Sequence, residues 1–252
     1  MARPPDATTV LAMLTDGRFP SGAHAYSAGM EQAVAWGDVD DLATAESFAR
    51  GRAATSATPA AQCTAAAGAI ATRAGPGRLA GMLDALDVEI DARTASRAAR
   101  EVSRQQGRRW LRAVQGVWPE ESAVRAPRRP DGRAVLDGRH GWVVVGVVGG
   151  RLGLGPTGTA TVALYELVGT PLWAAARLLG LDPVATTATV ARVLADVGPG
   201  AARAATTAAR RTGDRLDDGG PVDWSWISWA TAPLADLAAE GHLHREERLF
   251  AS

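Results

Sequence analysis

The stretch that decides the fold reads TATVALYELVGTPLWAAARLL, residues 159–179. It is apolar on nearly every face, a composition typical of a helix that is buried on all sides within a core. Pro171 removes one internal hydrogen bond and predicts a bend. Gly180 ends the helix, and Asp182-Pro183 caps and begins the next one. We therefore expect residues 159–179 to form the axis of a helical core.

Helical patterns with recognisable ends also precede this axis. Asp41 is placed to cap a helix, and Thr58-Pro59 is placed to begin another. Gly75-Pro76 begins the clearest helix, whose apolar side chains follow helical spacing. Its apolar stripe consists of Leu79, Met82, Leu83, Leu86 and Ile90.

Further helices are predicted over residues 94–114 and, after Gly198-Pro199, over about 201–212. Together these patterns predict an all-α protein, a single-domain helical bundle of about ten helices that spans residues 1–252. Residues 115–140 interrupt them with several prolines and glycines, which predicts a mobile surface loop. Its arginines, Arg125, Arg128, Arg129 and Arg133, are expected to lie on a solvated connector rather than to contact RNA.

The segment Trp142–Gly150 permits two interpretations. Its β-branched residues favour a buried strand, but Gly146 and Gly150, or Gly149 and Gly153, are four residues apart, a spacing that lets two helices approach closely. The following GLGPTG, residues 153–158, matches the G-x-G-x-x-G dinucleotide fingerprint. The rest of the chain offers almost no second strand for a parallel sheet, so glycines that pack helices and form a turn explain it better. A dinucleotide-binding oxidoreductase remains the alternative.

The composition excludes several function classes. The chain has no lysine, which removes Walker-type nucleotide loops, Schiff-base chemistry and Ser-x-x-Lys nucleophiles. Its formal net charge of zero provides no overall attraction to nucleic acid or to an anionic membrane. Cys63 is the only cysteine, which fits a reducing cytosol. The apolar run 142–148 is far shorter than the roughly 20 residues of a membrane span. We expect a soluble, cytoplasmic protein.

Catalytic and metal-binding patterns are weak. Ala25–Gly29 lacks the first glycine of a G-x-S-x-G nucleophile elbow, and the few histidines leave a Ser–His–acid site without a placed base and acid. His242 and His244, two residues apart, point to different faces of a helix. We predict no catalytic residues, no cofactor and no stable metal site, so the chain is not expected to be an enzyme.

Two segments are better candidates for contacts with partners. The loop Asp16–Glu31 carries a Pro20-Ser21-Gly22 turn and exposed-type polar and aromatic residues, and Ser27 is placed to cap the next helix. Residues 213–252 are predicted to form a linker and a partly mobile tail. Trp224, Trp226 and Trp229 lie within this tail, so it must fold back on the core or meet a partner.

Four separated blocks resemble the urease accessory protein F (UreF) family. Phe19–Glu31 resembles the family's P-x-G-G-aromatic-x-H/Y-S-x-G-L-E motif, and Arg100–Arg109 resembles R-E-x-S-x-x-x-G-R. Gly146–Leu154 is similar to a glycine-marked buried helix, and His242–Ser252 resembles H-x(5)-R-L-F-x-S. The chain departs from the pattern in carrying Ala23 for the second glycine of the first block, Leu243 for an acid, and Leu178-Leu179-Gly180-Leu181 for P-L-G-Q.

The resemblance implies an all-helical, non-enzymatic scaffold that forms a homodimer and joins the accessory protein UreD (UreH). That complex recruits the GTPase UreG, so that nickel reaches apo-urease; nickel is handled by the complex and not held stably by this chain. A divergent helical binding module without a urease role is a further alternative. The residues predicted to bind partners are Arg18, Phe19, Pro20, Gly22, His24, Tyr26, Ser27, Gly29, Glu31, Arg100, Glu101, Ser103, Gly107, Trp224, Trp226, Trp229, His242, Arg248, Leu249 and Phe250.

Overall fold

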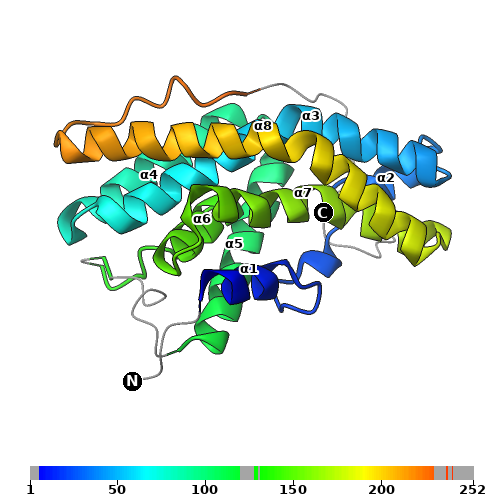
Figure 1. Cartoon of the computed structure of the whole chain (residues 1–252), viewed down its shortest axis with the longest axis horizontal. Coiled ribbons are helices and arrows are strands. Elements are labelled where there is room, and N and C mark those ends of the chain that lie inside the picture. Colours follow the sequence, from blue (N-terminus) through cyan, green and yellow to red (C-terminus); the bar gives the residue numbers. More distant parts are fainter. Residues whose placement is uncertain (1–5, 120–127, 130, 230–236, 238–239, 241–252) are drawn as a thin grey trace.

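The computed structural model describes residues 6–119, 128–129, 131–229, 237 and 240, and within them the chain consists of helices and the turns that join them (Figure 1). The α-helices are α1 Ala7–Thr15, α2 Met30–Trp36, α3 Leu42–Arg73, α4 Pro76–Arg93, α5 Arg97–Val117, α6 Gly141–Arg151, α7 Gly155–Leu179 and α8 Pro183–Asp217. A single 3₁₀ turn, η1, covers Ala23–Ala25. The predicted all-α class is therefore confirmed.

The described residues form eight α-helices rather than about ten, because two predicted breaks lie inside longer helices. Pro59 is inside α3 and Pro199 is inside α8. Each proline removes one backbone hydrogen bond. At Pro59, burial on neighbouring helices offsets that loss, whereas Pro199 is exposed and lies between the buried residues Val193 and Ala201. Every residue of α3 from Pro59 to Ile70 is buried. Helix α8 continues past Gly213, where a linker was predicted, and ends at Asp217.

Several helix ends lie where the sequence predicted them. The Asp41 side chain caps α3 and forms a capping box with Thr44, and α4 begins at Pro76. Asp182 caps α8 through the backbone N–H of Ala185. Helix α5 begins three residues later than expected, at Arg97, because Ser96 provides its cap.

Helix α3, not α7, is the axis of the molecule. It packs against α6, α7 and α8, and small side chains let all three approach it. Helices α3 and α8 lie side by side and run in the same direction, since Glu46 pairs with Arg192 and Arg50 with Asp196 at a constant separation of 146 residues (Figure 1). Cys63, in the middle of α3, is fully buried.

Helix α7 lies against both α3 and α8. Among the described helices it alone is long and apolar enough to cross a membrane, judged by length and composition. Most of its buried residues, which include Leu164, Leu167, Val168 and Leu172, belong to a core cluster shared with α3 and α8. Packing within the bundle therefore accounts for its apolar composition.

The segment Gly141–Arg151 is the helix α6, which resolves the choice between a strand and a glycine-marked helix. A Cβ atom at Gly146 would lie 2.3 Å from the carbonyl oxygen of Thr64, and one at Gly150 would lie 2.7 Å from the Cα atom of Gly68. The glycines four residues apart thus allow α6 and α3 to meet backbone to backbone, as the spacing predicted.

The segment 153–158 forms the turn between α6 and α7 and the first residues of α7. It follows a helix, and the described part of the chain contains no strand, only an isolated bridge between Arg128 and Ala134. A dinucleotide fingerprint needs a preceding strand within a parallel sheet. The dinucleotide-binding interpretation is therefore wrong.

The chain after α8 folds back on the core. Val222, Trp224 and Ile227 are buried in the same cluster as parts of α3, α4 and α6. The Trp224 ring lies 5.9 Å from that of Trp226, and the Trp229 ring lies 6.2 Å from that of Trp142, measured between centroids. Of the two outcomes predicted for these tryptophans, folding back on the core is the one observed.

Candidate functional site

The loop that resembles the first UreF block is held against α5 by aromatic contacts. Phe19 is buried and stacks on Trp110, with ring centroids 5.2 Å apart, and on Trp118 at 6.2 Å. The Arg109 guanidinium lies 4.9 Å above the centroid of the buried Tyr26 ring, a cation–π contact. The first two blocks, far apart in sequence, are therefore in direct contact.

Gly22 allows this contact in two ways. Its φ is +77°, in the left-handed region that side chains disfavour. A Cβ atom there would also lie 2.8 Å from Cδ of Arg109, the side chain that covers Tyr26. Any larger residue at position 22 would strain the turn and displace the arginine.

Glu166 joins the loop to α5 and α7. The Ser21 hydroxyl donates to its Oε1 atom at 3.2 Å, and the Trp110 indole N–H donates to its Oε2 atom at 3.1 Å. Burial raises the pKa of this carboxyl from an ordinary value of 4.5 to about 7. Sequence reasoning missed Glu166, although an acid within an otherwise apolar helix is a signal that could have found it.

The remaining loop residues divide into exposed and buried ones. Arg18, Pro20 and His24 are exposed, and Arg18 pairs with Asp16. Ser27, Gly29 and Glu31 are buried. Ser27 was predicted to cap α2 through its hydroxyl, and this is wrong. Gly29 is the capping residue, and the Met30 N–H bonds to the backbone carbonyl of Ser27. The Ser27 hydroxyl is buried and has no hydrogen-bond partner.

The residues of the second block hold α5 to its neighbours. Arg100 donates to the carbonyls of Thr94 and Ala95 beyond the end of α4, while Glu101 pairs with Arg97 on the surface. A Cβ atom at Gly107 would lie 2.1 Å from the carbonyl oxygen of Arg139, so only glycine lets the 139–140 backbone pass. The block is therefore architectural in the described structure.

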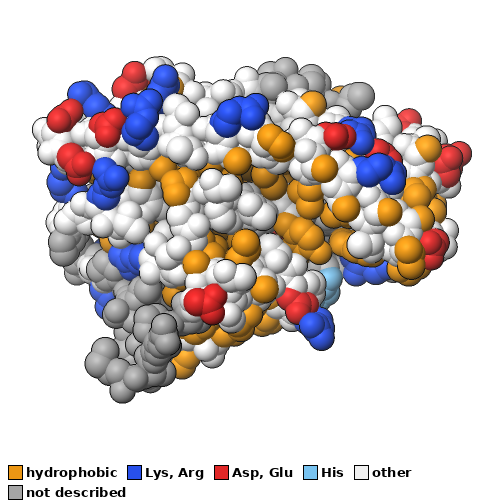
Figure 2. All heavy atoms as spheres, viewed as in Figure 1, with side chains coloured by type: hydrophobic (Ala, Val, Ile, Leu, Met, Phe, Trp, Pro, Cys, Tyr) orange, Lys and Arg blue, Asp and Glu red, His pale blue; other side chains and the backbone are white. Residues whose placement is uncertain are grey.

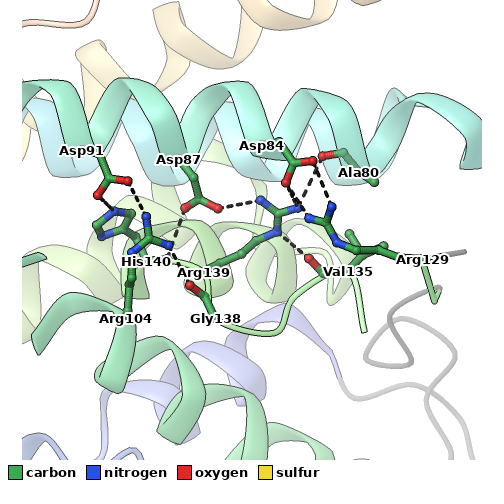
Figure 3. A network of polar contacts seen from close by, with 10 residues as sticks. All are labelled: Ala80, Asp84, Asp87, Asp91, Arg104, Arg129, Val135, Gly138, Arg139 and His140. Carbon is green, nitrogen blue, oxygen red and sulfur yellow. Dashed lines mark hydrogen bonds and ion pairs between the residues drawn. The ribbon is translucent and has the colours of Figure 1, made fainter. Parts of the chain in front are cut away.

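Carboxylates along α4 bind a ladder of arginines, shown in Figure 3. Asp84 binds Arg129 and Arg139, Asp87 binds Arg139, and Asp91 binds Arg104 and His140. The Arg139 side chain is only 2% exposed and also donates to the carbonyls of Ala80 and Val135. Arg128 and Arg133 are exposed, as expected of a solvated connector, but Arg129 and the buried Val135, Leu136 and Arg139 fix the described part of this segment to the core.

Ser103, His140 and Asp91 form a hydrogen-bonded chain. The Ser103 Oγ atom lies 3.0 Å from Nδ1 of His140, and Nε2 of His140 lies 2.9 Å from Asp91. The arrangement serves the start of α6, because the Ser103 hydroxyl also accepts the Gly141 N–H and Asp91 is shared with Arg104. Burial lowers the pKa of His140, which keeps the ring neutral in this network. The sequence pattern missed this chain because its three members are far apart in sequence.

A cavity of about 270 Å³ lies where these elements meet. Its walls come from the loop, from α3, α4, α5, α6 and α7, and from Trp229 in the chain that has folded back after α8. The side chains that border it include those of Tyr26, Ser103, Trp110, His140 and Glu166. The cavity is thus enclosed by the same side chains that connect the recognised blocks.

The tail residues are placed only in part. Trp224 is buried, and its carbonyl accepts from Arg93. Trp226 and Trp229 are partly buried. His242, Arg248, Leu249 and Phe250 lie outside the described residues. Contact of these residues with partners stays a prediction.

The fold and the site define an all-helical scaffold whose recognisable blocks position helices and a surface loop. The UreF family model matches residues 39–194 of the chain. The chain belongs to the UreF family of urease accessory proteins. This is a family of accessory proteins rather than enzymes, so the prediction that the chain is not an enzyme is confirmed.

Curated relatives are similar over nearly the whole chain. The urease accessory protein UreF of Mycolicibacterium vanbaalenii is 37% identical over 244 residues, covering 96% of this chain and 97% of that protein. UreF of Mycobacterium tuberculosis is 35% identical over 243 residues, covering 96% and 98%. UreF of Mycobacterium sp. strain JLS is 36% identical over 245 residues, covering 97% and 98%.

Proposed function

We propose that this chain is a cytoplasmic scaffold that joins UreD (UreH) and recruits the GTPase UreG for nickel insertion into apo-urease. The observation that carries the proposal is similarity to UreF proteins over 96% of the chain, including the loop and α5 blocks that meet in space. In this proposal nickel is handled by the assembled complex, and the chain contributes surfaces rather than a resident metal site. The chain acts as a homodimer.

The exposed part of the loop is the surface we assign to partners. Arg18, Pro20 and His24 project from it, and Pro20 borders a shallow groove together with Arg109 and Arg112 of α5. Phe19, Gly22 and Tyr26 lie beneath this surface and hold its shape. Their proposed role is to position the exposed residues.

A second surface suits a protein partner by its apolar character. Figure 2 shows hydrophobic side chains gathered in the middle of one face, over α7, while charged side chains lie mainly along α8 and at the edges. Contiguous apolar surface of this kind is typical of interfaces between proteins. We assign it to the second copy of the chain in the homodimer.

Co-purification with UreD and UreG, with and without GTP, tests the proposal. The double variant Arg18→Ala/His24→Ala is expected to recover less of the complex, whereas Arg203→Ala, which changes an exposed residue of α8, is the matched control. Recovery equal to the unmodified chain in the double variant would remove the loop from the interface. Light scattering of the isolated chain tests the homodimer.

A deletion tests the tail. Residues 241–252 should be removed rather than 224–252, because Trp224 and Ile227 are buried and their loss would unfold the core. Unchanged complex formation after this deletion would refute a role for the tail. A soluble chain that fails to restore urease activity in a strain lacking its own F protein would favour a helical binding module without a urease role.

A further inference from the structure

The cavity of about 270 Å³ has mostly apolar walls. Apolar side chains reach it from α4, α5, α6 and α7 and from the chain beyond α8; they are Ile90, Val102, Trp142, Val145, Leu167 and Trp229. Its volume is near the lower end of the roughly 300–1,000 Å³ that is usual for small-ligand pockets. A single ordered water needs far less space, so the cavity can hold a small organic group.

Two polar side chains at this cavity lack partners. The Tyr26 side chain is 1% exposed, and its hydroxyl is buried without a hydrogen bond. The Nε atom of Arg52, on α3, is likewise buried and unpaired. A buried donor left without an acceptor lowers stability, and an uncompensated charge lowers it further. A ligand that supplies acceptor oxygens would satisfy either group.

The other titratable side chains at the cavity are already engaged. Arg93 pairs with Glu89, and His140 binds Asp91. Glu166 is the only carboxylate among the described residues that border the cavity, and its two oxygens accept from Ser21 and Trp110. Arg52 itself is partly buried, and among the described residues no carboxylate contributes to its electrostatics. The cavity therefore has an unmatched positive charge.

We propose that this cavity binds a carboxylate carried on a small apolar group, with the carboxylate at Arg52 and Tyr26 and the apolar part among Val102, Val145, Leu167 and their neighbours. A carboxylate presents two acceptor oxygens and the opposite charge, which matches a guanidinium and a phenol. The apolar part is stabilised by its removal from water. Neither the UreF relationship nor the proposed function assigns such a site.

Octanoate is the probe, and its matched controls are 1-octanol and octylammonium, which have the same chain without a carboxylate. Trp110, Trp142 and Trp229 border the cavity, so tryptophan fluorescence of the full chain reports occupancy, and titration calorimetry gives the affinity. Octanoate is expected to bind at least tenfold more tightly than either control. Equal binding of octanoate and 1-octanol would overturn the proposal.

Three variants locate the site. Arg52→Gln removes the charge and is expected to weaken octanoate binding at least tenfold, and Tyr26→Phe removes only the hydroxyl and is expected to weaken it less. Ala99→Phe fills the cavity from α5 and is expected to abolish binding. Arg203→Gln, at an exposed position of α8, is the matched control and should bind as the unmodified chain does.

Only a variant that folds can test the site, so the fold of each variant is checked first. Circular dichroism and thermal unfolding establish which variants are native. Octanoate affinity unchanged in native Arg52→Gln, or in native Ala99→Phe should Arg52→Gln not fold, would overturn the site.

The carboxylate could come from a free acid or from an acidic side chain of a protein partner, and a second arm of the experiment distinguishes these sources. This arm alone rests on the proposed function. Assembly with UreD and UreG is measured with and without saturating octanoate. Competition assigns the site to a partner's side chain, and unchanged assembly assigns it to a free small acid.

Discussion

Two regions of the molecule are held together by opposite means. Where α3 meets α6, Gly146 and Gly150 bring backbone against backbone at Thr64 and Gly68, and the atoms nearest these two glycines are backbone atoms and the Ala67 Cβ. Where α4 meets α5 and the 128–140 segment, the contact is a ladder of aspartates and arginines (Figure 3). The first contact depends on the absence of side chains, and the second depends on side chains of opposite charge that pair with one another. The two should therefore fail under different changes.

The largest effect is expected from Gly146→Ala. The added Cβ atom would lie 2.3 Å from the Thr64 carbonyl oxygen and 2.6 Å from Cβ of Ala67, so α6 must move away from α3. We expect a loss of about 3 kcal/mol or more of unfolding free energy, at the upper end of overpacking costs. Urea denaturation measures it. Gly198→Ala, at a helical glycine with nothing within 4 Å, is the control and should be neutral or stabilising.

The second-largest loss of unfolding free energy is expected from Arg139→Met, which disrupts the ladder of aspartates and arginines. This change leaves the carboxylates of Asp84 and Asp87 without their buried partner, and breaking a buried pair costs about 3 kcal/mol. The double variant Arg139→Met/Asp87→Asn should recover part of the loss, because the amide removes the unpaired charge while its oxygen can still accept the His140 N–H. A double variant less stable than Arg139→Met alone would contradict a charge-based contact. Gly146→Ala should show no such rescue.

Glu166 adds a third kind of contact, because its carboxyl accepts hydrogen bonds from two neutral groups, the Ser21 hydroxyl and the Trp110 indole. Its pKa is raised from 4.5 to about 7, so the stability that its proton provides is complete near pH 4 and is lost as pH rises through 7. Glu166→Gln should therefore be more stable than the unmodified chain at pH 8, by about 2 kcal/mol, and close to it at pH 5. Urea denaturation at the two pH values checks this. A Glu166→Gln effect independent of pH would contradict the raised pKa.

The smallest effect is expected at the exposed ion pairs between α3 and α8. Arg50→Gln removes contacts with Glu46 and Asp196, whose side chains stay partly in water. Surface pairs of this kind contribute about 0.5 kcal/mol, and salt weakens them further. Thermal unfolding in low and high salt measures the difference. A loss as large as that of Arg139→Met would mean that exposure does not separate the two kinds of pair.

Much of the fold was predictable because local chemistry sets helix ends. Asp41, Gly75-Pro76 and Asp182 act through groups within a few residues of themselves, and the four-residue glycine spacing of α6 states directly which face can approach another helix. The break predicted at Pro59 was wrong because burial against distant helices offsets a local loss. The break predicted at the exposed Pro199 was wrong although only the residues on either side of it, Val193 and Ala201, are buried in the core. The sequence around each proline carries no sign of that burial.

The site was less predictable for the same reason. Phe19, Gly22 and Tyr26 were predicted as site residues from their block. The residues that they contact, Arg109 at the end of the second block and Trp110 beyond it, were not predicted as site residues. The partners of Arg129 and Arg139 lie 45 to 55 residues away, and only the fold brings them together. The aspartates at positions 84, 87 and 91 do share one face of α4, and their spacing was the available signal.

The parallel pairing of α3 with α8 also affects the order of events during synthesis. Arg50 can pair with Asp196 only after another 146 residues have been synthesised. At about 5–20 residues per second, α3 leaves the ribosome roughly 7–30 seconds before the helix that covers it. During that interval only the earlier partners, and α6 and α7 as they emerge, can shield its alanine-rich face. The nascent chain is therefore most prone to aggregation before α8 appears, and slower translation through residues 183–217 should lower the soluble yield.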